Sequence, residues 1–163
     1  MKWTSSLNPR RAIAITVSVV ALGGAFTPPR SHAIKQTGGE YNTLYANLGA
    51  KGYDVVSYFT DGKPVKGSER YTHNYGGVTW HFSSQEHRDA FAADPAKYAP
   101  QYGGFCSWGV SQGKLFDVDP EHGWAIVDGK LYLNFNGDIH RTWLKDTRGF
   151  ISKADQNFPT LNK

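Results

Sequence analysis

The feature that most constrains the fold of this chain is an internal repeat with an offset of 52 residues. Without a gap, this offset aligns residues 77–80 with residues 129–132. Further along it pairs side chains of similar type, namely Glu86 with Asp138, Phe91 with Trp143, Asp94 with Asp146 and Tyr98 with Phe150. A fixed offset predicts that one supersecondary unit occurs twice, and chance similarity between two units of the same class is the alternative.

Each copy has the pattern of a β-hairpin followed by a helix. The predicted strands are residues 70–75 and 78–82 in the first copy and residues 124–127 and 130–135 in the second. Gly76-Gly77 and Asp128-Gly129 supply the turns between them, and the second of these pairs is strongly favoured in two-residue hairpin loops.

The helices that follow have recognisable start signals. Ser83 and Glu86 have the spacing of a capping box, and Asn136 is expected to cap the helix of the second copy. Asp94 and Asp146 then mark the start of a further turn or short helix. The sequence therefore predicts an α+β domain, in which two pseudo-repeated units of hairpin plus helix form a small antiparallel sheet covered by helices.

The first 33 residues have the pattern of a cleavable export signal. A basic stretch ending in Arg10 and Arg11 precedes a 15-residue apolar run from Ala12 to Phe26, and small residues lead to a cleavage point after Ala33. A membrane span needs about 20 apolar residues, which disfavours an uncleaved anchor. The paired arginines suggest the twin-arginine route, and Sec export is the alternative that the sequence leaves open. We expect a periplasmic or otherwise exported mature chain without stable membrane insertion.

The formal net charge of +4 lies entirely in this predicted signal. The first 33 residues hold four Lys or Arg and no Asp or Glu, which leaves 14 basic against 14 acidic residues in the rest of the chain. Proteins that bind nucleic acid need a basic patch to neutralise phosphates. We therefore expect no nucleic-acid partner.

Cys106 is the only cysteine, so the chain cannot form an internal disulfide and must be stabilised by its core. Aromatic residues make up 14% of the sequence, and each buries roughly 150–250 Å² in a core. The thiol itself is open to three interpretations: a small buried hydrophobic residue, a metal ligand or a reactive nucleophile.

An ordered motif surrounds the first predicted hairpin. It consists of Tyr-Gly-Gly-Val-Thr-Trp-His-Phe-Ser-Ser at residues 75–84, followed by Phe91, Pro95 and Tyr98. This pattern resembles the YHS domain, and residues 52–59 and 101–106 resemble the longer, exported bacterial branch of that family. The resemblance spans about Tyr53 to Pro159. YHS domains accompany copper-transporting ATPases and some oxygenases, so the resemblance implies a small metal-associated or sensory module.

The chain also departs from the metal-binding form of this family. Ser57, Ser83 and His87 stand where that form has cysteines, and serine hydroxyls are poor ligands for Cu(I) or zinc. The metal candidates are His87, by family position, and Cys106, by chemistry, with copper favoured only through the family. His87 also shares a predicted helix face with Phe91, which favours a buried structural histidine.

Two other kinds of site are compatible with the sequence. Gly103 and Gly104 precede Cys106 and can leave N–H groups free for an anion, as in a thiol enzyme, but they are equally typical of a tight turn. The aromatic candidates for a ligand-binding cleft are Trp80, Tyr102 and Trp108, unless these side chains belong to the core.

Together these patterns predict an export signal at residues 1–33, a lead-in segment at 34–52, a YHS-type domain at 53–159 and a tail at 160–163. The favoured function is that of an exported, non-catalytic binding module for a metal ion or a small ligand. A thiol-dependent enzyme using Cys106 and a purely protein-interaction or structural module are the alternatives.

Overall fold

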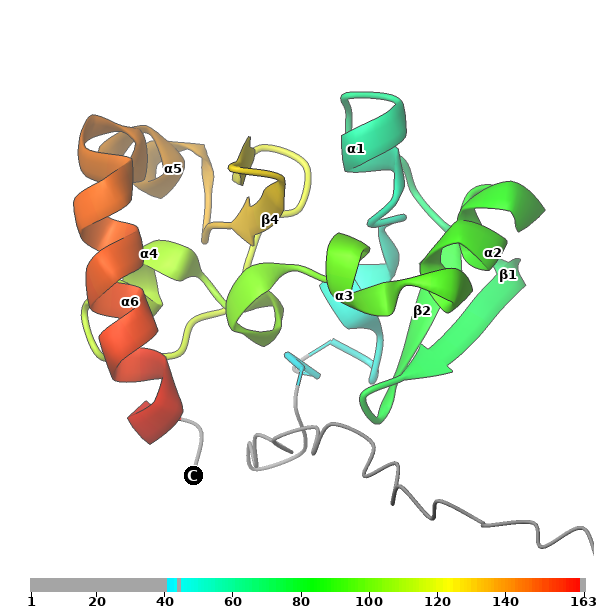
Figure 1. The fold of residues 1–163 in the computed structure, drawn as a ribbon, viewed down its shortest axis with the longest axis horizontal. Helices are drawn as coiled ribbons and strands as arrows, with labels where there is room; N and C mark the ends of the chain where they lie inside the picture. Colours follow the sequence, from blue (N-terminus) through cyan, green and yellow to red (C-terminus); the bar gives the residue numbers. More distant parts are fainter. Residues whose placement is uncertain (1–40, 44, 162–163) are drawn as a thin grey trace, which may run out of the picture. The chain divides into compact units, whose positions relative to one another are not determined.

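Two successive groups of elements, each built around one hairpin, make up the structure (Figure 1). The computed structural model describes residues 41–43 and 45–161, which all belong to one compact unit at residues 31–163. The first repeat contains the 3-10 turn η1 (Gly49–Gly52), helix α1 (Ser57–Thr60), strands β1 (Ser68–Tyr75) and β2 (Val78–Phe82), and helices α2 (Gln85–Ala93) and α3 (Pro95–Tyr98). The second repeat contains η2 (Gln101–Gly104), α4 (Ser107–Ser111), β3 (Trp124–Val127), β4 (Lys130–Leu133), α5 (Gly137–Trp143), η3 (Leu144–Asp146) and α6 (Thr147–Leu161).

The two hairpin turns form where the sequence predicts them. Both central residues of each turn have positive φ, at 62° and 80° for Gly76 and Gly77 and at 50° and 72° for Asp128 and Gly129. This backbone is the one that matches the twist of the flanking strands, and it favours Gly or Asp because neither is strongly penalised there. The predicted strand bounds are confirmed to within two residues.

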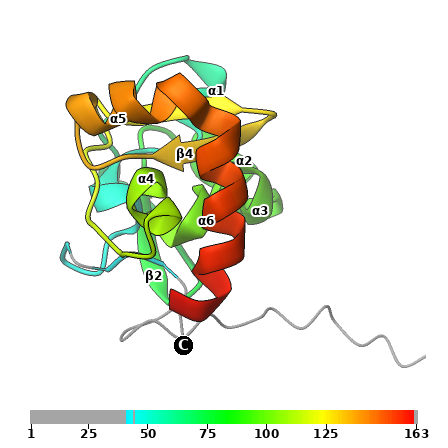
Figure 2. The same cartoon turned by 90° about the vertical axis from the view of Figure 1, so that its left-hand side faces the viewer.

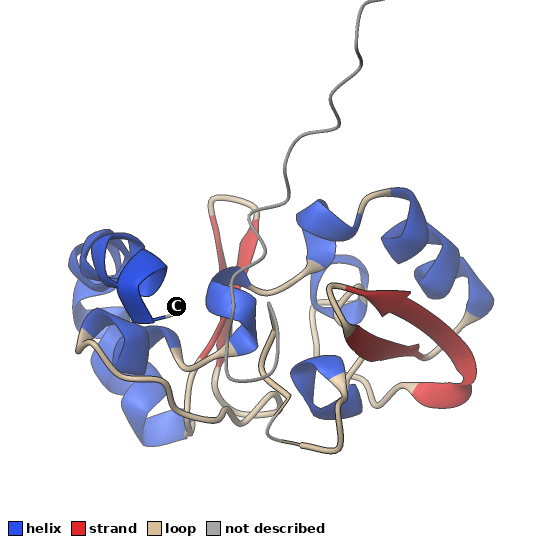
Figure 3. Ribbon diagram, turned by 90° about the horizontal axis from the view of Figure 1, so that it is seen from below, coloured by secondary structure: helices blue, strands red, loops and turns tan. Residues whose placement is uncertain are grey.

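The α+β class is confirmed, but the hairpins form two separate two-stranded antiparallel sheets rather than one (Figure 3). The free edge of β2 is already covered by the segment before η1, because the N–H of Thr79 donates to the carbonyl of Asn47 at 3.2 Å and Leu48 forms a parallel bridge with Thr79. This contact occupies the edge of β2 at Thr79, where the second hairpin would otherwise pair.

Helix capping agrees with the sequence except at one position. Asn136 accepts the N–H of Ile139 at 2.8 Å, as predicted for the cap of α5. At α2 the predicted cap Ser83 is wrong: Ser84 accepts the N–H of His87 at 3.1 Å. Ser83 has a different partner, Asp54, which sequence spacing did not reveal.

The core consists of two clusters: the first joins residues of both repeats, the second belongs to the second repeat, and β4 contributes to both. Leu131 and Leu133 are fully buried in the first cluster, with Phe91, whereas Tyr132 points to the opposite face and packs with Trp143 in the second. This division follows from the alternation of side chains along a strand. Helix α6 packs along α4 in the second repeat (Figure 2).

The predicted signal at residues 1–33 lies outside the described residues. Tyr41 and Ala50, from the predicted lead-in segment, pack in the first cluster, and α6 continues the structure to Leu161. Among the described helices, none has the length and apolar character needed to span a membrane.

Candidate functional site

A buried carboxylate organises the first repeat. Asp54 has an exposed fraction of 0%. Its Oδ1 accepts the N–H groups of Val56 at 2.9 Å and Ser57 at 3.3 Å. Its Oδ2 accepts the N–H and the hydroxyl of Ser83 at 2.8 and 2.6 Å, and lies 2.7 Å from Nδ1 of His87. Both oxygens therefore have partners, as a buried carboxylate requires.

His87 lies in the first turn of α2 and uses both of its ring nitrogens. In the neutral tautomer that donates from Nδ1 to Asp54, the lone pair lies on Nε2, which is 3.2 Å from Oγ1 of Thr60 and 3.9 Å from Oδ1 of Asp61. The side chain is 17% exposed. A carboxylate on Nδ1 is the arrangement that orients metal-binding histidines, and it also satisfies a structural histidine.

Cys106 is enclosed in the second repeat, with an exposed fraction of 0%. Its Sγ accepts the N–H of Gly109 at 3.4 Å and lies 3.9 Å from Oδ1 of Asn134. Burial raises the pKa of the thiol, and the hydrogen bond from the N–H of Gly109 offsets only part of this effect. A thiol with no exposed surface and a raised pKa lacks the character of a catalytic nucleophile.

The offset of 52 residues aligns Cys106 with Asp54 in the sequence. Before each of them the backbone makes the same left-handed turn, with φ of 46°, 55° and 79° at residues 50–52 and of 54°, 62° and 78° at residues 102–104. One N–H donor also corresponds: Ser57 donates to Oδ1 of Asp54 at 3.3 Å, and Gly109 donates to Sγ of Cys106 at 3.4 Å. Trp108, the counterpart of Val56, instead donates its N–H to Oδ1 of Asn134 at 3.2 Å. His87 corresponds to Ile139, so the second repeat keeps the left-handed backbone turn but has no imidazole at the equivalent position.

The two metal candidates thus belong to different environments. His87 is bonded to Asp54 in the first repeat, and Cys106 is enclosed by backbone groups and Asn134 in the second. No group of three or more His, Cys, Asp or Glu side chains within residues 41–43 and 45–161 is arranged to hold a metal ion. The structure therefore does not bring the predicted donors together as a multidentate site.

The three aromatic ligand candidates also lie in different places. Trp80 is 1% exposed and belongs to the first core cluster, where its ring N–H donates to the carbonyl of Tyr75 at 3.0 Å. Trp108 lines a small apolar pocket of about 170 Å³ with Phe116, Phe135 and Ile139.

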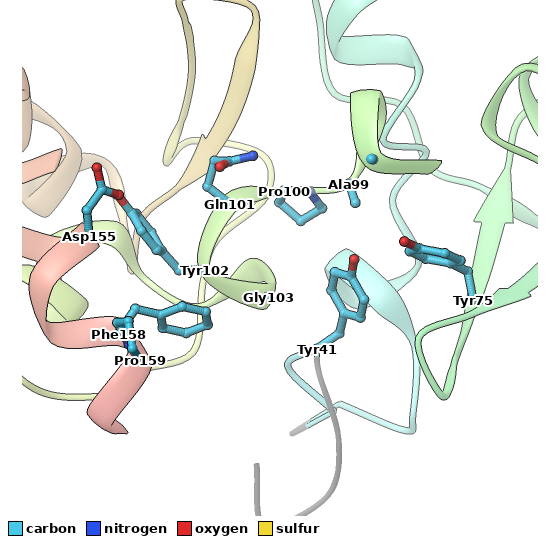
Figure 4. A pocket seen from close by; sticks show the side chains of 11 residues that line it. Tyr41, Tyr75, Ala99, Pro100, Gln101, Tyr102, Gly103, Asp155, Phe158 and Pro159 are labelled. Atoms are coloured by element: carbon cyan, nitrogen blue, oxygen red, sulfur yellow. The ribbon is translucent and has the colours of Figure 1, made fainter. Parts of the chain in front are cut away.

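Tyr102 lines a larger cavity of about 400 Å³, which is the pocket drawn in Figure 4. Its other lining residues come from the segment before η1, the end of β1, the region of α3, η2 and α6: Tyr41, Tyr75, Ala96, Ala99, Pro100, Gln101, Gly103, Asp155, Phe158 and Pro159. Cavities of this volume are within the range of small-molecule sites.

Residues 56–102 match the family model of the YHS domain. The match covers less than a third of the chain and contains α1, β1, β2, α2 and α3, together with the first two residues of η2. The remainder of the second repeat lies outside it. The resemblance seen in the sequence is thereby confirmed, over a shorter span than the expected Tyr53 to Pro159. No curated protein and no solved structure shows a significant match to the chain.

The positions that hold cysteines in the metal-binding form of the YHS domain are all occupied by hydrogen-bonding groups. Ser57 donates its hydroxyl to the carbonyl of Asp54 at 2.7 Å and lies 3.0 Å from the carbonyl of Lys63. Ser83 and His87 are bonded to the carboxylate of Asp54. This closed network of oxygen and nitrogen atoms does not fit a soft ion such as Cu(I), which prefers thiolates.

Sequence reasoning missed two residues of these sites. Asp54 was not selected, although the repeat itself aligns it with the singled-out Cys106. Asp155 was not selected because an isolated carboxylate on a helix carries no signal until the fold places it beside Tyr102.

Proposed function

We propose that the chain is a non-catalytic binding module that holds a small ligand in the cavity around Tyr102. The observation that carries this proposal is the cavity of about 400 Å³ at the junction of the YHS domain and the second repeat. The YHS domain contributes Tyr75 and the segment 96–102, and α6 contributes Asp155 and Phe158.

The composition of the cavity lining supports a ligand. It combines aromatic rings with a few polar groups, and small-molecule sites are commonly built from apolar walls and a few polar atoms that fix orientation. Tyr102 is held in place by another lining residue, because its hydroxyl donates to Oδ1 of Asp155 at 2.8 Å.

A fragment screen observed by NMR tests this proposal. We expect some compounds to shift the backbone amide signals of Gln101 and Gly103. Ala96→Trp should block binding, because Ala96 is an exposed residue in the cavity lining and a large side chain there fills the space. Ala92→Trp, at an exposed position of α2 that does not line the cavity, is the matched control. Binding that is equal in both variants would place the ligand elsewhere and overturn the proposal.

A metal ion at His87 is the second candidate function, supported by the family and by the Asp54–His87 pair, which leaves Nε2 as the ligand atom. Asp61 is the nearest carboxylate to Nε2, at 3.9 Å. Calorimetric titration with Zn²⁺ or Cu²⁺ tests it. His87→Gln should abolish binding, whereas His122→Gln, which removes a 68% exposed imidazole, should not.

Copper(I) binding through Cys106 stays a prediction of the family resemblance. Loss of stoichiometric copper in a Cys106→Ser variant would support it, and unchanged binding would reject it. The complete burial of the thiol argues against it and against the thiol-enzyme alternative.

We also propose that the protein is exported to the periplasm, on the pattern of residues 1–33. N-terminal sequencing of protein from its native host should find Ile34 as the first residue. A retained N-terminus in the membrane fraction would indicate an anchor instead.

A further inference from the structure

The lining of the cavity of about 400 Å³ includes two aromatic pairs. The ring centroids of Tyr41 and Tyr75 are 5.9 Å apart, and those of Tyr102 and Phe158 are 5.4 Å apart. Figure 4 shows the segment from Pro100 to Gly103 passing between the two pairs. The rings of Tyr41, Tyr102 and Phe158 are largely buried, with exposed fractions of 6%, 7% and 9%, so a ligand would meet only the small exposed part of each.

Among the described residues that line the cavity, Asp155 is the one with a formal charge, and it is acidic. It lies on the exposed face of α6 at the edge of the cavity, and none of the other described lining residues is Lys, Arg or His. Its Oδ1 accepts the hydroxyl of Tyr102 at 2.8 Å. Burial, and next the hydrogen bond to Asp155, raises the pKa of Tyr102, so this hydroxyl remains a donor at neutral pH and leaves the negative charge on the carboxylate.

We infer that the ligand of this cavity is a small organic cation, such as a quaternary ammonium or a protonated amine; this inference rests on the proposed function and names its ligand class. Aromatic faces attract cations through their quadrupole, and Tyr and Phe rings arranged around a space are the usual means of binding ammonium groups. The carboxylate of Asp155 adds a charge of the opposite sign at the edge.

Other ligand classes fit the lining less well. An anion would find no basic side chain and would be repelled by Asp155. A metal ion would find a single carboxylate, which is too few ligands for Ca²⁺ or Mg²⁺. A neutral apolar ligand would use the rings but would gain nothing from the carboxylate.

A pair of probes with the same shape and different charge tests the inference. Choline is the cationic probe, and 3,3-dimethylbutan-1-ol is its neutral isostere. We expect choline to bind about tenfold more tightly, as followed by NMR at low salt, because only choline gains the cation–π and Coulomb interactions. Asp155→Asn, which keeps an acceptor for Tyr102, should weaken choline binding and leave binding of the alcohol unchanged. Asp89→Asn makes the same charge change on α2, outside the cavity, and should affect neither.

The outcomes separate the ligand class from the proposed function. Equal affinity for both probes, blocked by Ala96→Trp, would overturn the cation inference and leave the binding module in place. Failure of both probes to bind would also overturn the inference. The proposed function would also be overturned only if Ala96→Trp weakened the binding of no compound in the fragment screen.

Discussion

Asp54 and Cys106 occupy the same position in the two repeats, and each accepts the N–H of the residue three positions later, Ser57 and Gly109 respectively. The difference lies in the side chain opposite them, which is His87 in the first repeat and Ile139 in the second. The first position therefore holds a carboxylate bonded to an imidazole, and the second holds a thiol next to Asn134. The two repeats share the left-handed backbone turn before this position and differ in the side chains that it carries.

The first prediction concerns the buried carboxylate. Asp54→Ala should lower the free energy of unfolding by about 3–5 kcal/mol, because it leaves three backbone N–H groups and His87 without their acceptor. Urea unfolding measures this change. Asp61→Ala, at a side chain that is 35% exposed, is the control and should cost less than about 1 kcal/mol. Similar decreases in the free energy of unfolding of the two variants would show that the hydrogen bonds of Asp54 do not stabilise the first repeat.

The second prediction tests whether the positions of Asp54 and Cys106 are structurally equivalent. Cys106→Asp alone should destabilise the fold by at least about 2 kcal/mol, because the new carboxylate is buried without an imidazole partner. Ile139→His supplies that partner at the position equivalent to His87. The double variant should recover about 1–3 kcal/mol relative to the sum of the two single changes, measured as a double-mutant cycle. Simple additivity of the two losses would contradict the equivalence.

The sequence was sufficient for local structure and insufficient for partners distant along the chain. The turns at Gly76-Gly77 and Asp128-Gly129 could be predicted because their residue types determine a local backbone. Ser83 could not be assigned correctly, because its true partner Asp54 lies 29 residues earlier and only the fold joins them. The repeat predicted two units, but whether their hairpins join in one sheet depends on what covers the edge of β2.

The sequence could name residues of the candidate site, but it could not tell which of them line a cavity. Tyr102 was selected as an aromatic ligand residue and does line a cavity, whereas Trp80, selected on the same grounds, belongs to the core. Aromatic side chains serve both purposes, and composition does not separate them.

The third prediction concerns the accessibility of Cys106. A thiol reagent at neutral pH should label the folded protein on the order of a thousandfold more slowly than the urea-unfolded protein, because the sulfur is fully buried and reaction requires opening of the structure. The raised pKa further reduces the thiolate fraction, so any reaction in the folded state should accelerate as the pH rises. Rapid labelling of the folded protein would reopen the thiol-enzyme hypothesis.

The fourth prediction is a dependence of stability on pH that arises from His140. Burial, and next the charge of Arg141, lowers the pKa of this imidazole below the ordinary value of 6.5, and its Nδ1 lies 3.3 Å from the side-chain Nδ2 of Asn134, which requires an unprotonated nitrogen there. Between the lowered pKa and 6.5, the unfolded chain binds a proton that the folded chain does not. The free energy of unfolding should therefore fall as the pH decreases through this interval, and His140 should contribute no slope above it. His140→Gln should remove this part of the pH dependence in urea unfolding measured from pH 7 to pH 5. An NMR titration that places the midpoint of His140 at or above 6.5 would contradict the assignment.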